Sequence, residues 1–377
     1  MRSLTGQIIF PDHQSAGSIE FGSHIEKITP LKEAPDTYIL PGFVDGHVHG
    51  GDGADTMDGV EAIRKMALFH LRHGTTTILP TTITRPWEDI LTVLEAISRV
   101  MKEGVPNGPH IHGAHIEGPF VSPHKLGAQP AFAIEPTAER VDELIKSGCV
   151  SLVTIAPELA HSDTAMESFA KAGIRVSLGH TVANYEQTER ALCIICGAGG
   201  TAGATHLFNA MPSIQGRDPG PVTAFMCHDV AYAEMIFDTH HVHPATFRLA
   251  SKTMDNRLLF VTDAMRGAGQ EDGPSQLGGQ DVMIKEGVVR LPNGSLAGSV
   301  LTLDQAFRNA VRHGASLSKA SRLVSTNAAR YLGLHDRGEI CEGKLADFAV
   351  MDRDFRIKEM WVAGNKVFSR EGSLSDS

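Results

Sequence analysis

The sequence predicts an α/β fold, namely a (β/α)8 barrel of the TIM type with a small β-sandwich domain formed by both chain termini. Eight short apolar or β-branched runs alternate with amphipathic helical stretches, which predicts a closed parallel barrel. Short alternating strands at both chain ends predict the sandwich. The alternative is a doubly wound open sheet, but the turn after the first run contains a His-x-His triplet instead of a glycine-rich phosphate loop.

The eight expected barrel strands are short and are separated by helical stretches. Eight strands that alternate with helices imply a parallel sheet, and closure into a barrel is the simplest solution for that number. The strands are Phe43–His49, Thr75–Thr81, Ile111–Glu117, Ser151–Ala156, Arg175–His180, Gly203–Asn209, Ala233–Asp238 and Leu258–Asp263.

The expected helices carry apolar residues at helical spacing. In the first of them, Gly59–His73, the residues Ile63, Met66, Ala67 and His70 share one face. The others are Trp87–Glu103, Thr137–Gly148, Asp163–Gly173, Tyr185–Gly197, Pro244–Met254 and a shorter segment at Pro221–His228.

The two chain ends have a different pattern from the middle. Short alternating strands are expected at Gln7–Phe10, Ser18–Phe21 and His24–Ile28, and again at Asp347–Met351 and Met360–Phe368. We therefore assign residues 1–40 and 335–377 to the sandwich and residues 41–334 to the barrel. The serine-rich end, 373–377, is expected to fray.

Composition narrows the class of protein. A chain of 377 residues with 42% hydrophobic and 21% charged residues is typical of a globular protein with one large and one small domain. The net charge of −10 without a basic block argues against a nucleic-acid partner, although local Arg or His residues can still bind a small anion. No apolar run reaches membrane-spanning length and no signal peptide is recognisable, so a cytoplasmic location is expected.

The number and spacing of the cysteines give no sign of disulfide bonds. Five scattered cysteines argue against a disulfide framework. Cys193 and Cys196 form a C-x-x-C pair within an apolar helix, and we expect them to be buried core thiols rather than a redox or zinc pair.

The ends of the expected strands carry the residues that point to chemistry. In barrel enzymes, functional residues lie at the carboxyl ends of the strands. Imidazole and carboxylate groups are ligands for divalent metals such as zinc, and two histidines separated by one residue on a strand point to the same face. A single buried histidine is ordinarily a packed core residue. Four histidines and two carboxylates at the ends of strands on one rim instead predict a metal site. They are His47, His49, Glu117, His180, His206 and Asp263.

Two further groups of histidines have weaker signals. His115 lies two residues before Glu117 on the same strand face, so it either supports the metal ligands or simply packs in the core. Of His240, His241 and His243, which follow the seventh strand, we expect one to reach the barrel mouth.

Several motifs resemble a known family. The segments Phe43–Gly50 and Gly343–Val350 resemble the first-strand and C-terminal signatures of the amidohydrolase superfamily. More narrowly, the chain is similar from about residue 40 to residue 366 to the N-acetylglucosamine-6-phosphate deacetylase family. The segments that carry this resemblance are His115–Phe120, Thr205–Met211, His241–Pro244 and Val261–Ala264.

The resemblance implies an activity and a cofactor. It implies hydrolytic removal of acetate from N-acetylglucosamine 6-phosphate in a cytoplasmic homodimer that uses one or two divalent ions, Zn²⁺ or Fe²⁺. Matched residue by residue, Glu117, His180 and His206 are the common metal ligands, and Asp263 is the catalytic acid and base. His47 and His49 match the pair that adds a second metal in some members.

The same resemblance implies the substrate contacts. Asn209, Ala210, Arg217 and His241 match positions that hold the sugar and the phosphate, some of them across the dimer interface. One residue departs from the family: Gln129 stands where a histidine usually helps to polarise the scissile carbonyl. Glutamine can donate a hydrogen bond there but cannot carry a positive charge.

Rival functions remain open on the sequence alone. The closest keeps the chemistry and changes the substrate to N-acetylgalactosamine 6-phosphate or an N-acyl amino acid. A nucleobase deaminase would leave the sugar-phosphate motifs unexplained. A non-catalytic scaffold relative would have lost metal ligands, whereas all of these positions hold competent residues here.

Overall fold

The computed structural model describes residues 1–370, and each of the eight segments expected to form a barrel strand contains a β-strand. The expected frayed tail at 373–377 lies outside the described residues. The strands of these eight segments form a three-stranded sheet, β5-β8-β9, and a six-stranded sheet, β10 to β15 in sequence order. Isolated parallel bridges from Val48 to Ala264 and from Thr81 to His115 link the two sheets. The strands are β5 (Phe43–Val48), β8 (Thr75–Pro80), β9 (His110–Ile111), β10 (Ala114–Glu117), β11 (Val150–Ile155), β12 (Arg175–Leu178), β13 (Ala202–Ala204), β14 (Tyr232–Met235) and β15 (Leu258–Phe260).

Several strands end earlier than the sequence pattern predicted. The expected third strand is divided into β9 and β10, and Gly113 lies between them. A Cβ atom there would lie 2.0 Å from Ser151 Oγ, so the close approach to β11 requires glycine. β12, β13 and β15 end before His180, His206 and Asp263, which have positive φ angles.

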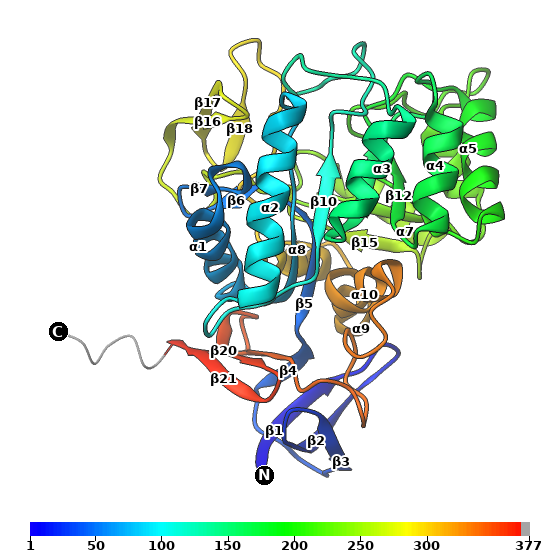
Figure 1. The fold of residues 1–377 in the computed structure, drawn as a ribbon. Coiled ribbons are helices and arrows are strands. Elements are labelled where there is room, and N and C mark those ends of the chain that lie inside the picture. The colour runs from blue at the N-terminus through cyan, green and yellow to red at the C-terminus, as the bar shows by residue number, and fades with distance from the viewer. Residues whose placement is uncertain (371–377) are drawn as a thin grey trace.

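Helices surround the strands (Figure 1). Each expected helix is present within a few residues of its predicted bounds, because an apolar stripe at helical spacing faces the sheet. In α2 this stripe consists of Ile90, Val93, Leu94, Ile97 and Val100. The helices are η1 (Thr56–Asp58), α1 (Val60–Leu71), α2 (Trp87–Glu103), α3 (Ala138–Ser147), α4 (Ser162–Lys171), α5 (Tyr185–Gly197), α6 (Pro221–Cys227), α7 (Pro244–Thr253), α8 (Leu303–Arg312), α9 (Leu317–Ser321), the π-helical η2 (Arg322–Thr326) and α10 (Asn327–Leu332).

A small antiparallel sheet after β15 was not predicted. It contains β16 (Gly273–Leu277), β17 (Gln280–Lys285) and β18 (Val288–Arg290) and lies at the end of the molecule away from the N-terminus (Figure 1). Gly278 and Gly279, with φ of +57° and +82°, form the two-residue turn between β16 and β17. A second small hairpin, β6 (Gly50–Gly51) with β7 (Ala54–Asp55), follows β5.

Both chain ends meet in one seven-stranded sheet at the opposite end of the molecule (Figure 1). Its order is β21-β20-β19-β4-β1-β2-β3, so β4 joins the N-terminal strands to the C-terminal ones. Side chains alternate between its faces: Ile8 and Ile39 belong to a separate small core, whereas Ile9 and Leu40 pack into the main core. The strands are β1 (Arg2–Ile9), β2 (Gln14–Phe21), β3 (Ile25–Pro30), β4 (Tyr38–Pro41), β19 (Phe348–Met351), β20 (Ile357–Val362) and β21 (Asn365–Ser369).

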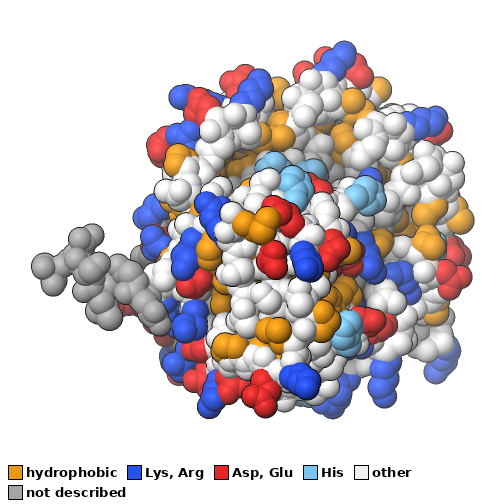
Figure 2. Space-filling model, turned by 90° about the horizontal axis from the view of Figure 1, so that it is seen from below, with side chains coloured by type: hydrophobic (Ala, Val, Ile, Leu, Met, Phe, Trp, Pro, Cys, Tyr) orange, Lys and Arg blue, Asp and Glu red, His pale blue; other side chains and the backbone are white. Residues whose placement is uncertain are grey.

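The surface and the cysteines complete the description. Lys, Arg, Asp and Glu side chains are interspersed over the face shown in Figure 2. All five cysteines are free, but Cys193 is exposed and Cys196 is half-buried, so the expectation of buried core thiols was wrong. The C-x-x-C spacing places them on the outer part of α5, because the face that packs inward is formed by Leu192 and Ile195. Within residues 1–370 there is no helix with the length and apolar character needed to cross a membrane.

Candidate metal centre

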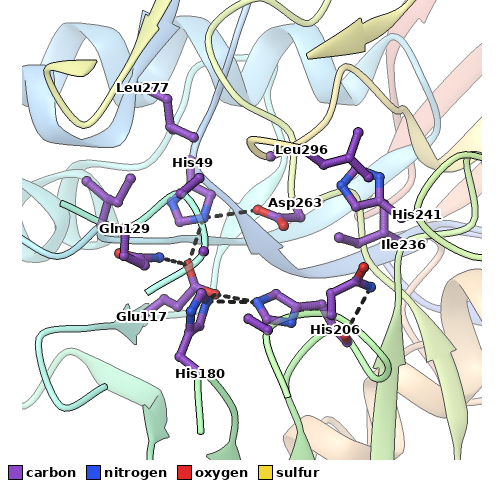
Figure 3. Close-up of a pocket in the computed structure, with 16 residues that line it drawn as sticks. His49, Glu117, Gln129, His180, His206, Ile236, His241, Asp263, Leu277 and Leu296 are labelled. Carbon is purple, nitrogen blue, oxygen red and sulfur yellow. Dashed lines mark hydrogen bonds and ion pairs between the residues drawn. The ribbon is translucent and has the colours of Figure 1, made fainter. Parts of the chain in front are cut away.

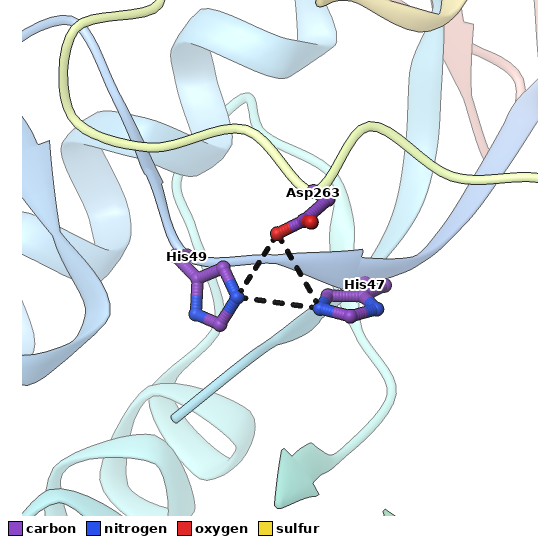
Figure 4. A group of neighbouring side chains, drawn as sticks. All are labelled: His47, His49 and Asp263. Carbon is purple, nitrogen blue, oxygen red and sulfur yellow. Dashed lines mark hydrogen bonds and ion pairs between the residues drawn. The ribbon is translucent and has the colours of Figure 1, made fainter. Parts of the chain in front are cut away.

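β5 brings two histidines to the barrel mouth. His47 lies in the strand and His49 directly follows it, so both side chains point to the same side of the chain. Both are buried, and their Nε2 atoms lie 3.2 Å apart. Asp263 Oδ1 lies 3.2 Å from His49 Nε2 and 3.6 Å from His47 Nε2 (Figure 4). These three side chains form the first group of candidate ligands.

A second group forms around Glu117 at the end of β10. Its Oε1 lies 3.2 Å from His180 Nε2 and 3.0 Å from His206 Nε2 (Figure 3). The two imidazole Nε2 atoms are themselves 3.0 Å apart. All three side chains are buried and converge on one point.

Glu117 lies between the two groups. Its Oε1 is 3.3 Å from His47 Nε2, and its Oε2 is 3.1 Å from His49 Nε2. One carboxylate therefore faces both sets of imidazoles.

The backbone holds three of these residues in a conformation that side chains rarely adopt. His180, His206 and Asp263 have φ angles of +48°, +32° and +48°, in the left-handed region. Such conformations cost of order 1–3 kcal/mol and persist where the surrounding structure enforces them, which is common at functional sites. The turn after each strand thereby directs the side chain into the barrel mouth.

The carboxylates control the protonation of the cluster. Burial alone would lower the pKa of His47 and His49, but Glu117 and Asp263 raise the pKa of His47 well above its usual value and that of His49 to about 9. Burial would raise the pKa of Glu117, but the surrounding histidines hold it well below its usual value. The histidines must lose protons to bind a metal, so metal affinity should fall on acidification.

The donor set fits a divalent ion. Imidazole nitrogens and carboxylate oxygens are the ligands of catalytic zinc and related metals. The close approach of His180 Nε2, His206 Nε2 and Glu117 Oε1 brings three potential lone pairs together, which a cation between them would satisfy. Both groups are therefore suited to metal binding.

A cavity of about 170 Å³ opens onto these ligands (Figure 3). Asn209, Ala210 and His241 line it, and His241 is the member of the His240–His243 set that reaches the mouth. His241 Nδ1 pairs with Asp238 Oδ2 at 2.6 Å. The apolar part of the lining consists of Ile83, Ile236, Leu277 and Leu296.

Gln129 also lines the cavity, but its amide group is already engaged. Its Nε2 donates to Glu117 Oε2 at 2.6 Å, and its Oε1 accepts a hydrogen bond from the Thr84 backbone N–H at 2.7 Å. An amide nitrogen carries two N–H groups, so one remains for a substrate. Gln129 therefore contacts a candidate metal ligand as well as the cavity.

Arg217 is not brought to the cavity within this chain. It lies exposed in the loop that follows the His206 motif and is not part of the cavity lining. Its role in phosphate binding remains a prediction.

Two supporting residues lie behind the ligands. His115 contacts the His47 ring edge-on, with centroids 4.6 Å apart, and hydrogen-bonds Thr154 Oγ1 at 2.8 Å. Glu234, which sequence reasoning missed, is buried with Oε2 3.0 Å from His47 Nδ1. The available signal was a charged residue in an expected barrel strand, where only a paired carboxylate is tolerated.

Comparisons with known proteins identify the family of the chain. Residues 38–367 match the amidohydrolase family. The chain is 36% identical to N-acetylglucosamine-6-phosphate deacetylase of Vibrio furnissii, over 88% of this chain and 83% of the relative. It is 34% identical to N-acetylgalactosamine-6-phosphate deacetylase of Escherichia coli O157:H7, over 96% of this chain and 97% of the relative.

Solved structures extend the likeness. N-acetyl-D-glucosamine-6-phosphate deacetylase of Mycobacterium smegmatis, in complex with N-acetyl-D-glucosamine-6-phosphate, superposes with a TM-score of 0.90 at 33% identity, covering 97% of this chain and 99% of that one. The corresponding enzyme of Thermotoga maritima also has a TM-score of 0.90, at 31% identity over 98% of this chain and all of that one. The fold is therefore the TIM-barrel-type fold of the superfamily, and the chain belongs to the amidohydrolase family, where its relatives include the N-acetylglucosamine-6-phosphate deacetylases.

Proposed function

We propose that this protein hydrolyses the acetamide bond of N-acetylglucosamine 6-phosphate, releasing acetate and glucosamine 6-phosphate. The observation that carries the proposal is the convergence of Glu117, His180 and His206 in a cavity that Asp263, Asn209 and His241 also line. Relatives that cover most of the chain carry this activity in their names.

We propose a divalent cofactor held by Glu117, His180 and His206, with a second position at His47, His49 and Asp263. Zn²⁺ or Fe²⁺ matches imidazole and carboxylate donors. The position of Glu117 between the two groups supports two ions per chain.

The chemistry follows from the donor geometry. A bound divalent ion supplies Lewis acidity, which polarises the amide carbonyl and makes water a usable nucleophile near neutral pH. Asp263 accepts the proton of the attacking water and then donates it to the departing amine nitrogen, as a general base and a general acid in turn. The imidazoles of His47 and His49 hold Asp263 in position for both transfers.

Substrate contacts complete the proposal. Asn209, Ala210 and His241 are placed to hold the sugar, and Gln129 has one free N–H for the acetamide oxygen. We propose that Arg217 binds the phosphate of a substrate in the neighbouring subunit of a homodimer, since it lies outside the cavity of its own chain.

Further parts of the assignment are also proposals. The two bridges between the sheets support a closed eight-stranded barrel over 41–334. The separate small core of the terminal sheet supports a second domain of 1–40 and 335–377, with a sandwich as its proposed architecture. The resemblance further predicts a cytoplasmic enzyme.

A second substrate has a specific observation in its favour. The relative that acts on N-acetylgalactosamine 6-phosphate matches nearly the whole chain in both directions, and Gln129 replaces the usual family histidine. The decisive experiment measures acetate release from both epimeric sugar phosphates and from N-acetylglucosamine without phosphate. The proposal expects the highest kcat/KM for N-acetylglucosamine 6-phosphate. Preference for the galacto epimer would select the second function, and preference for the unphosphorylated sugar would reject both.

A further inference from the structure

Glu234 is a buried carboxylate inside the barrel wall. It lies on β14, between β13 and β15, with 1% of its surface exposed. A charged group in such a place is strongly unfavourable unless it is paired and hydrogen-bonded. Neither the proposed substrate contacts nor the proposed ligand groups use this carboxylate.

Its contacts lead directly to the metal centre. Glu234 Oε2 lies 3.0 Å from His47 Nδ1 and 3.3 Å from the backbone nitrogen of His206. The His47 ring is fully buried, and its other nitrogen, Nε2, faces Glu117, His49 and Asp263.

This pairing determines which nitrogen of His47 can bind a metal. A carboxylate accepts hydrogen bonds, so Nδ1 must carry the proton it donates. In the neutral ring the lone pair then lies on Nε2, which points into the ligand cluster. A histidine ligand with a carboxylate on its far nitrogen is fixed in orientation and is a stronger donor.

The other three rings are held differently. His180 Nδ1 pairs with a backbone carbonyl, that of Lys125, at 3.1 Å. The Nδ1 atoms of His49 and His206 have no hydrogen-bond partner within residues 1–370. His47 is therefore the ligand candidate that a carboxylate orients, and it belongs to the group that would hold the second ion.

We propose that Glu234 is a positioning residue that fixes the tautomer and orientation of His47 and thereby allows the ion position formed by His47, His49 and Asp263 to fill. This inference rests on the proposed role of His47 as a ligand. The Glu117, His180 and His206 position should depend on Glu234 much less, because its contact there is a longer one to the backbone of His206.

The test compares metal affinity at the two positions in Glu234→Gln and Glu234→Ala. The purified full-length protein is stripped with chelator and titrated with Zn²⁺ against a chromophoric competitor, and the bound ions are counted by metal analysis. Glutamine keeps an acceptor for Nδ1–H but loses the charge, whereas alanine loses both. We expect the His47, His49 and Asp263 position to lose about 10–100-fold in affinity, more in the alanine variant than in the glutamine variant, while the Glu117, His180 and His206 position changes little.

Asp304→Asn is the matched control. Asp304 is also a buried carboxylate that pairs with a histidine, with Oδ1 3.2 Å from His73 Nδ1, but it lies outside the metal centre. Its removal should change thermal stability without changing either zinc affinity. The near-isosteric glutamine variant of Glu234 keeps the comparison valid if the alanine variant does not fold.

Two results would overturn the inference, and they are distinguishable. If the wild type binds two ions and both Glu234 variants bind them with unchanged affinity, Glu234 does not position His47, and the proposed function stands. If a His47→Gln, His49→Asn double variant has the same zinc affinities as the wild type, His47 is not a ligand. In that case the two-ion part of the proposed function fails together with the inference.

Discussion

Asp263 combines an unusual backbone with a central place in the cluster. Its Oδ1 lies 3.2 Å from His49 Nε2, and its φ of +48° directs the carboxylate into the cavity. Asp263→Asn keeps the shape and hydrogen-bonding reach but removes the proton acceptor. We expect kcat to fall by about 10²–10⁴-fold, the usual contribution of general acid–base catalysis.

Steady-state acetate release measures this effect, with bound metal measured on the same samples. Metal at the Glu117 position should be retained, because Asp263 is not in that group. A variant with near-normal kcat would assign the base to another residue. A variant with no metal at all would show that Asp263 acts through binding of the ion.

Arg217 distinguishes a sugar-phosphate deacetylase from a general amidohydrolase. A guanidinium binds phosphate oxygens through charge-assisted hydrogen bonds that contribute about 1.5–3 kcal/mol. Arg217→Ala should therefore lower kcat/KM for the phosphorylated sugar by about 10–100-fold. It should leave the unphosphorylated sugar almost unaffected.

The control for Arg217 is Arg353→Ala. Arg353 is also an exposed arginine, and it pairs with Asp36 in the terminal sheet region, away from the cavity. It should alter neither substrate's kcat/KM. Equal losses on both substrates in Arg217→Ala would mean that this arginine supports the fold instead of the phosphate.

The candidate ligand residues could be recognised in the sequence because they lie at the ends of expected strands. A strand pattern that ends in His or Glu points both to a strand and to a candidate ligand at its end, as for Glu117 and His206. The partners of Gln129 and Glu234 could not be predicted in this way. Each depends on which distant strand lies alongside, and no local pattern encodes that β14 places a carboxylate behind His47.

At the scale of elements, α1 is tied to the hairpin after β5 by a buried histidine. His70 Nε2 donates to the Gly50 carbonyl at 3.0 Å, and burial lowers the pKa of His70 to about 4 despite this hydrogen bond. The unfolded chain has an ordinary histidine pKa near 6.5. Between these values the unfolded state binds the extra proton, so stability is lost as the pH falls from about 6.5 to about 4.

His70→Gln removes this titration and keeps a donor for Gly50. The free energy of unfolding of the wild type should fall by about 3 kcal/mol more than that of the variant over this pH range, from a pKa difference of roughly 2.5. Urea unfolding at a series of pH values measures the difference. His335→Gln, at an exposed position, should retain the wild-type pH dependence. Parallel curves for His70→Gln and the wild type would contradict the assignment.

Helices were predicted more accurately than strand ends, for a physical reason. A helix carries its periodicity over ten or more residues, as in α2, so its existence is clear from local sequence. Strand length depends on where hydrogen bonding to the neighbouring strands stops, and β13 is much shorter than the predicted strand Gly203–Asn209. The β16–β18 sheet was missed because Gly278-Gly279 is a short signal between weakly alternating segments.

At the scale of the whole molecule, the candidate ligands come from β5, β10 and the turns after β12, β13 and β15. An ion bound to them connects strands around the barrel, and the site itself exists only where folding brings these residues together. Free Zn²⁺ at 100 times its dissociation constant should therefore raise the free energy of unfolding by about 2.7 kcal/mol.

Urea unfolding with Zn²⁺ and with excess chelator measures this coupling. A His180→Ala, His206→Ala double variant should show a smaller effect, since Glu117 would lose both imidazole partners of its group. If the wild-type unfolding midpoint were the same with Zn²⁺ and with excess chelator, no ion would bridge these strands.

The terminal sheet also imposes an order on synthesis. β4 ends at residue 41 and is paired on one side by β1, but its other partner, β19, begins at residue 348. About 300 residues must leave the ribosome in between, which takes roughly 15–60 s at typical elongation rates. During that interval one edge of β4 has no strand to pair with, and such edges invite association with other chains. The terminal sheet is therefore completed only after the whole stretch between β4 and β19 has been made.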